Sequence, residues 1–264
     1  MQNSYQNIIV QEKSKHVILL TFNRPEVANA FNTEMAVEIT HFFESISSII
    51  SDARVIVITG SGEKAFCAGG DLKERNGMSD DKWQSQHLIF ERMIRSIINC
   101  PIPIIGAING AAYGGGCELA AALDFIYVAE NAKFAQTEVN LGIIPGIGGT
   151  QNLSRAIGEK KAKELIFTGA VFSATQAYEW GLANKIFPLK ILLDKTLDAA
   201  KLISEKGPIA IKQAKIAINK GIQMSLLDGM AFEIEAYNRT ISTEDRKEGI
   251  KAFNEKRKPD FIGK

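Results

Sequence analysis

The chain has 264 residues, of which 45% are hydrophobic, and its 31 basic side chains nearly balance 30 acidic ones. This length can bury a large core, and the net charge of +1 gives no general attraction to nucleic acid or to an anionic membrane. No apolar run reaches the ~18 residues of a membrane span, and residues 1–7 lack a charged leader with an apolar stretch. We therefore expect a cytoplasmic protein with no nucleic-acid or membrane partner.

The three cysteines, Cys67, Cys100 and Cys117, are odd in number and lack C-x-x-C spacing, and no histidine cluster follows them. This pattern favours neither a disulfide framework nor a metal site. We expect all three thiols to be reduced and buried in the core, where free cysteine behaves as a small apolar side chain.

Strand and helix signals alternate in the first half of the chain. Residues 16–22 and 55–60 are short β-branched runs that end in turn residues, and residues 33–50 between them have a helical period with Thr33 as N-cap. A second helix is expected at 81–98, followed by strands at 104–108 and 125–129. This order predicts an α/β fold.

Beyond about residue 150 the helical signal dominates. Helices are expected near 160–167, 174–180, 189–204, 208–219 and 226–242, followed by a charged tail at 255–261. The sequence shows no low-complexity linker and no repeat of constant period. We expect a strand-and-helix core with a helical C-terminal third.

Two glycine turns carry the clearest chemical signal. Gly69 and Gly70 follow the strand at 55–60, and Gly114, Gly115 and Gly116 open an apolar helix. Backbone N–H groups exposed in two such turns can converge on one carbonyl oxygen and stabilise negative charge as it develops there. A tight loop without a ligand explains either turn taken alone. The glycine spacing matches neither a dinucleotide-binding fingerprint nor a phosphate loop.

Two glutamates accompany these turns. Glu118 lies in the helix that Gly115 opens, and Glu138 follows 20 residues later, far enough for the chain to return alongside itself. Such a pair can hold one water between two carboxylates, although exposed surface positions are the usual place of glutamate. The apolar flanks of both residues indicate burial. Nucleophilic catalysis has less support, because the histidines lie outside both glycine turns and no G-x-S-x-G elbow is present.

The motifs resemble the crotonase superfamily in order and spacing over nearly the whole chain. They are residues 23–30, 66–74, 109–120, 136–138 and 145–151, with a terminal Glu-Lys-Arg-Lys stretch at 255–258. The resemblance implies a spiral of ββα units over about residues 1–200 and a helical region over 201–264 that forms homotrimers, often paired into hexamers. It also implies acyl-CoA substrates, with CoA as part of the substrate and no separate cofactor or metal.

The resemblance assigns the site residue by residue. The oxyanion donors fall on the N–H groups of Gly70 and Gly115, and the substrate-binding positions also include the loop residues Ala68, Asp71, Leu72 and Lys73. Glutamate at both catalytic positions, Glu118 and Glu138, is similar to the enoyl-CoA hydratases, which add water across the C2=C3 bond of a trans-2-enoyl-CoA.

Alternative activities share this scaffold. A Δ3,Δ2-enoyl-CoA isomerase needs chiefly the Glu138 proton shuttle. Residues 71–75, 162–167 and 214–219 resemble the methylglutaconyl-CoA hydratases of leucine breakdown. Some of those relatives bind RNA through a lysine-rich helix, but residues 41–50 contain no lysine or arginine, so RNA binding is not expected.

Overall fold

The computed structural model describes residues 5–49 and 52–264, so part of the N-terminal segment considered above and the last residue of the first predicted helix lie outside it. Six strands form the larger sheet in the order β1-β2-β3-β5-β7-β10. All neighbours in this sheet are parallel except β1 and β2. The strands are β1 (Ile8–Ser14), β2 (Val17–Phe22), β3 (Val55–Gly60), β5 (Ile104–Ile108), β7 (Phe125–Ala129) and β10 (Lys185–Phe187).

A second sheet has the order β4-β6-β8-β9. Its strands are β4 (Ala65–Cys67), β6 (Ala111–Tyr113), β8 (Lys133–Ala135) and β9 (Phe172–Ser173). Three times in succession the chain places one strand in the larger sheet and the next strand in this one: β3 then β4, β5 then β6, and β7 then β8. This repeated pairing of strands winds the chain into a spiral, as predicted.

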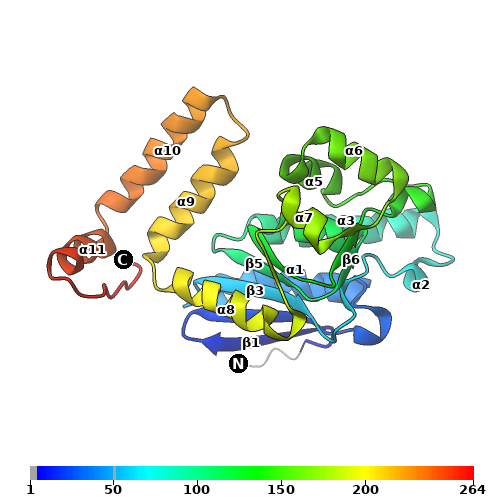
Figure 1. Cartoon of the computed structure of the whole chain (residues 1–264), viewed down its shortest axis with the longest axis horizontal. Helices are drawn as coiled ribbons and strands as arrows, with labels where there is room; N and C mark the ends of the chain where they lie inside the picture. Colours follow the sequence, from blue (N-terminus) through cyan, green and yellow to red (C-terminus); the bar gives the residue numbers. More distant parts are fainter. Residues whose placement is uncertain (1–4, 50–51) are drawn as a thin grey trace.

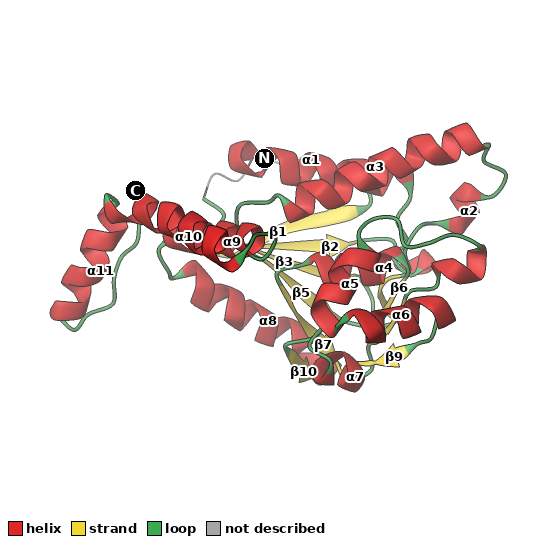
Figure 2. Ribbon diagram, turned by 90° about the horizontal axis from the view of Figure 1, so that it is seen from above, coloured by secondary structure: helices red, strands yellow, loops and turns green. Residues whose placement is uncertain are grey.

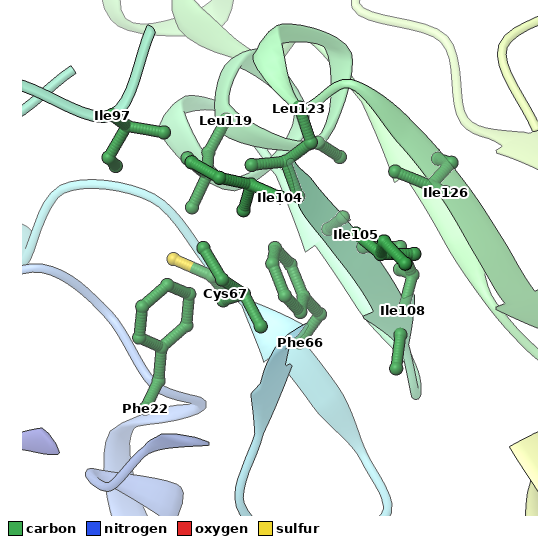
Figure 3. Packing of buried hydrophobic residues seen from close by; sticks show 14 of the residues in the cluster. Phe22, Phe66, Cys67, Ile97, Ile104, Ile105, Ile108, Leu119, Leu123 and Ile126 are labelled. Atoms are coloured by element: carbon green, nitrogen blue, oxygen red, sulfur yellow. The ribbon is translucent and has the colours of Figure 1, made fainter. Parts of the chain in front are cut away.

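The central strands of the larger sheet are buried along their whole length. Every residue of β3 and β5 is buried, which explains why both are continuous apolar runs without alternation. Figure 3 shows Leu119 and Leu123 lying over Ile104 and Ile105, with Phe66 and Cys67 below them. Phe66 also contacts Phe22, with ring centroids 5.3 Å apart. One continuous core therefore joins the two sheets to the helix that carries Glu118.

The helices of the first two thirds pack around these sheets (Figures 1 and 2). Both expected helices of the first half are confirmed, the second beginning one residue earlier than predicted, at Asp80. Thr33 is the first residue of the first helix and not its N-cap, because Asn32 Oδ1 accepts from the Met35 N–H at 2.9 Å. The helices are α1 (Thr33–Ile49), α2 (Leu72–Arg75), α3 (Asp80–Ile98), α4 (Gly115–Ala122), α5 (Gly149–Ile157), α6 (Glu159–Thr168), α7 (Ala174–Glu179) and α8 (Leu189–Ser204), with short 3-10 turns at Pro25–Val27 and Glu138–Leu141.

The C-terminal helices α9 (Pro208–Gly221), α10 (Leu226–Ile241) and α11 (Glu244–Asn254) extend away from the sheets (Figure 1). Helix α8 ends at Ser204. It therefore crosses residue 200, the boundary predicted from the sequence between the spiral core and the C-terminal helical region. Lys215 of helix α9 contacts the core. Its Nζ lies 2.7 Å from Asp124 Oδ2 and donates to the Ile102 carbonyl. Over residues 5–49 and 52–264, no helix combines the length and the apolar character needed to cross a bilayer.

Candidate active site

The Gly69-Gly70 turn is held by a strand-like bridge to Phe31. The Phe31 N–H donates to the Gly69 carbonyl at 2.7 Å, and the Asp71 N–H donates to the Phe31 carbonyl at 2.8 Å. In a parallel bridge of this kind the residue between the two bonds directs its own N–H to the opposite side. The N–H of Gly70 therefore points away from Phe31. Gly69 adopts φ 89°, which glycine reaches without strain.

The second turn lies directly against the first. A Cβ placed on Gly69 would lie 2.9 Å from the Gly115 nitrogen, so the two turns pack backbone to backbone. Gly114 takes φ 51° and Gly115 is the first residue of α4, where a helical N–H has no partner within its own helix. A Cβ on Gly116 would lie 2.0 Å from the Cys67 carbonyl oxygen. The contact between Gly69 and Gly115 supports the predicted convergence of the Gly70 and Gly115 N–H groups.

Glu118 lies one turn along α4 from Gly115, on the same helix face. Its side chain is 3% exposed, and its Oε1 accepts hydrogen bonds from the Ile147 N–H at 2.9 Å and the Gly149 N–H at 2.7 Å. Burial raises the pKa of Glu118, and the N–H groups of Gly149 and Ile147 oppose that rise. A carboxylate that accepts two backbone N–H bonds is fixed in position and stabilised in its ionised form.

Glu138 begins the 3-10 turn after β8 and is 8% exposed. Burial, the charge of Glu118 and a hydrogen bond with Glu118 together raise its pKa to about 7. Its Oε1 would lie 3.3 Å from a Cβ on Gly114, beside the second glycine turn. The two glutamates predicted to work together are therefore neighbours, and Glu138, with a pKa of about 7, can carry a proton near neutral pH.

A cavity of about 840 Å³ opens over these groups. Of the predicted site residues, the cavity lining includes Ala68, Gly70, Leu72, Gly115, Glu118 and Glu138. Most of the large apolar side chains in the lining come from α3 and from the loop after Glu138, and they include Trp83, Leu88, Phe90, Leu141, Ile143, Ile144 and Ile147. An apolar pocket with a few convergent polar groups is the usual form of a small-molecule site.

Comparisons with known proteins agree with this geometry. A family model described as enoyl-CoA hydratase/isomerase matches residues 12–264. The chain belongs to the enoyl-CoA hydratase/isomerase family. It is 40% identical over 263 residues to a crotonyl-CoA hydratase of Syntrophomonas wolfei, covering 99% of this chain and 100% of that protein. It is 39% identical over 252 residues to a short-chain-enoyl-CoA hydratase of Clostridium acetobutylicum, covering 96% of each chain.

A solved enoyl-CoA hydratase structure from Bacillus anthracis has a TM-score of 0.96 to this chain at 43% identity, and the match covers 98% of this chain and 100% of that one. The crotonase fold inferred from the sequence motifs is therefore confirmed for this member of the enoyl-CoA hydratase/isomerase family.

Two predicted substrate-binding residues, Asp71 and Lys73, do not line the cavity. Asp71 is the N-cap of α2, accepting from the N–H of Lys73 at 3.0 Å, and Arg24 donates to it at 2.9 Å. Burial acts to raise the pKa of Asp71, but the hydrogen bond from Arg24 and the backbone N–H groups outweigh burial and lower that pKa. In this family member, Asp71 shapes the loop that carries Gly70.

Gln136 belongs to the site but had no predicted role. It is fully buried, and with its amide nitrogen facing Glu138 it donates to both carboxylate oxygens at 3.1 and 3.2 Å. A Cβ on Gly149 would lie 2.8 Å from this amide and 2.7 Å from Glu118 Cγ. The glycine-rich motif at 145–151 therefore supplies the N–H groups that hold Glu118.

His87 lines the cavity from α3, although the sequence placed it outside both glycine turns and gave it no role. Its ring packs against Gly146, where a Cβ would lie 2.6 Å from the imidazole, and its Nε2 lies 3.7 Å from Glu91 Oε1. The three cysteines are free and buried, as expected, and burial raises the pKa of Cys67 to about 12. Within the described parts of the chain, no three His, Cys, Asp or Glu side chains form a metal-binding group.

Proposed function

We propose that this protein is an enoyl-CoA hydratase that adds water reversibly across the C2=C3 bond of a trans-2-enoyl-CoA. The observation that carries this proposal is the pair of buried neighbouring carboxyls whose environments differ. Glu118 is held by two backbone N–H groups, and Glu138 has its pKa raised to about 7 by burial and by Glu118. Environments that separate two carboxyls in this way assign one as base and the other as acid.

The mechanism follows from this assignment. The thioester oxygen accepts hydrogen bonds from the N–H groups of Gly70 and Gly115, which stabilise the enolate as it forms. Ionised Glu118 takes a proton from the water that adds to C3, and protonated Glu138 gives its proton to C2. One water is consumed, one C–O and one C–H bond form, and the pair as a whole keeps a single charge. The backbone N–H groups and the two carboxyls supply the polarisation and the proton transfers of these steps, and CoA is part of the substrate.

The same geometry argues against the alternative of double-bond isomerisation. Moving a proton between C2 and C4 needs one carboxyl, and Glu138 alone would serve for that step. Glu118 is buried, and the N–H groups of a separate loop are arranged around it. An ionised carboxylate is costly to bury. Activation of water gives that buried carboxylate a purpose that isomerisation does not.

The test is loss of the 2-enoyl thioester absorbance when purified protein is added to crotonyl-CoA. Glu118→Gln and Glu138→Gln should each lower kcat by about 10²–10⁴, the range expected for a positioned general acid or base. Glu159→Gln is the matched control, because Glu159 is an exposed helix residue that pairs with Lys163 outside the cavity. Absence of turnover by the unaltered protein would contradict the hydratase proposal.

We also propose that the region 201–264 assembles the protein into a homotrimer or a hexamer. Large apolar side chains on α9 and α10 are strongly exposed, including Ile218, Ile222, Leu226, Leu227, Ile234 and Tyr237. Large apolar side chains exposed on two neighbouring helices favour association with another chain. The free thiols of the protein suit the reducing cytoplasm, where we propose the enzyme works.

A further inference from the structure

The loop before α5 holds Glu118 but has few backbone bonds of its own. The Ile147 N–H donates to Glu118 Oε1, yet residues 144–147 form no backbone–backbone hydrogen bond with any other described residue. Pro145 and Ile147 are buried, whereas Gly146 between them is exposed. A segment without backbone bonds takes its position from side-chain contacts. The place of the N–H groups around Glu118 therefore depends on what contacts this loop.

His87 supplies the contact at Gly146. A Cβ placed on Gly146 would lie 2.6 Å from His87 Cε1 and 3.1 Å from His87 Nε2, and the next nearest atom, His87 Nδ1, would be 3.6 Å away. Gly146 is not among the glycines with positive φ, so its backbone conformation suits any residue. The imidazole of His87 is thus the group that excludes a side chain at Gly146.

The imidazole is carried by a well-anchored part of the fold. His87 lies on α3, which buries Phe90 and Met93 in the core. Its Nε2 lies 3.7 Å from Glu91 Oε1, one turn further along the same helix. A side chain on a packed helix holds its position more precisely than one on a loop. His87 can therefore limit how far the loop moves away from Glu118.

We infer that His87 is a positioning residue for hydration, which holds Gly146 so that the N–H groups of its loop stay on Glu118. This inference rests on the proposed hydratase function. The N–H groups of Gly149, Ile147 and Gly146 oppose the rise that burial causes in the pKa of Glu118, and the charge of protonated His87 acts in the same direction. A displaced loop would leave Glu118 less well oriented toward the attacking water. His87 acts through the loop and needs no contact with the substrate.

A double-mutant cycle on His87 and Gly146, assayed with crotonyl-CoA, tests this inference. Gly146→Ala pushes the loop away from the ring and should lower kcat by about 10²-fold, as a displacement of about 1 Å can do. His87→Ala releases the loop and should lower kcat by about tenfold. In the double variant the new methyl group enters the space left by the ring, so kcat should be no lower than in His87→Ala. KM should change less than about threefold throughout, because no substrate contact is lost.

His41→Ala and Gly207→Ala are the matched controls. His41 lies on α1 beside Tyr5 and outside the cavity lining, and a Cβ on Gly207 would meet no atom closer than 3.8 Å. Each should keep kcat within about threefold of the unaltered protein. Losses that multiply in the double variant would overturn the inference, and so would an unchanged kcat in His87→Ala. A rise in KM at constant kcat would also overturn it, because His87 would then bind the substrate directly.

A measurement without turnover separates failure of this inference from failure of the proposed function. The pKa of Glu118 can be followed by carbon-13 NMR of labelled glutamate in the Glu138→Gln protein. Gly146→Ala should raise this pKa, because the loop N–H groups lower it, but should not raise it when His87→Ala is also present. An equal rise with and without His87 would overturn the inference.

The last comparison leaves the charge of residue 87 unchanged, so it reports the loop alone. If Gly146→Ala does not fold by itself, the double variant should fold, and its failure to do so would also overturn the inference. The expected pattern of pKa values in a protein that hydrates no enoyl thioester would support the positioning role of His87 and reject the hydratase.

Discussion

Raising the pH through 7 should slow hydration by removing the proton that Glu138 donates to C2. Burial and the neighbouring Glu118 raise the pKa of Glu138 from 4.5 to about 7, which corresponds to about 3 kcal/mol of cost to ionising it, at 1.36 kcal/mol per unit. One unit above that pKa only about a tenth of the molecules keep the proton, so kcat/KM should fall about tenfold per pH unit.

The assay is the pH dependence of kcat/KM for crotonyl-CoA at constant ionic strength, because this parameter reports groups of the free enzyme. The acidic carboxyl itself can be followed by carbon-13 NMR of labelled glutamate in Glu118→Gln. There the pKa of Glu138 should move down, because the charge and the hydrogen bond of Glu118 both raise it. A rate that is constant from pH 6 to about 8.5, or one that rises through 7, would refute the assignment of Glu138 as the acid.

The same shift has a consequence for stability. Because the folded pKa of Glu138 lies above its ordinary value of 4.5, its favourable contribution is complete below pH 4.5 and is lost as the pH rises through about 7. Glu138→Gln removes this cost, so at pH 8 the variant should be more stable than the unaltered protein by up to about 3 kcal/mol. Urea unfolding of both proteins at pH 5 and pH 8 measures the difference, and equal gains at both values would contradict it.

Three further predictions concern the glycine turns and the C-terminal helices. Gly115→Pro removes the N–H while proline remains suited to the first helical position, so this variant should lower kcat by about 10²–10³. Gly115→Ala keeps the N–H and should keep most of the activity. Similar losses of kcat in the two variants would contradict the oxyanion role. Gly116→Ala should destabilise the fold by about 1–3 kcal/mol or more in thermal unfolding, since its Cβ would lie 2.0 Å from the Cys67 carbonyl oxygen, and an unchanged Tm would refute this contact. Leu227→Asp, which charges a side chain that is 77% exposed on α10, should shift the protein to monomers in light scattering without lowering its Tm, and an unchanged mass would argue against association through this surface.

The sequence by itself determined the long elements and identified the groups proposed to react. The strands at 55–60, 104–108 and 125–129 have the bounds expected from it, because continuous β-branched runs ending in turn residues carry their signal locally. The glycine turns and the two glutamates were recognisable for a related reason: positions that need exposed N–H groups or a carboxyl restrict residue type directly.

The short strands and the last helix were decided by tertiary structure. Strands β4, β6 and β8 have three residues each, too few for a periodic pattern, and they exist because they pair with one another across the spiral. Helix α11, Glu244–Asn254, was absent from the sequence prediction, which assigned no element between the preceding helix and the charged tail. Its buried Asp245 accepts from the N–H groups of Ile262 and Gly263, a contact between distant positions.

The surroundings of the two glutamates also depended on the fold. Glu118 is held by N–H groups about 30 residues away, at Ile147 and Gly149, and Arg75 and His87 reach the cavity because α2 and α3 fold over the first glycine turn. Nothing in the residue types at these positions distinguishes them from ordinary surface or core residues. The sequence specifies the chemical type of each residue. The pKa of a residue and its partners depend on burial and on neighbours that only folding brings together.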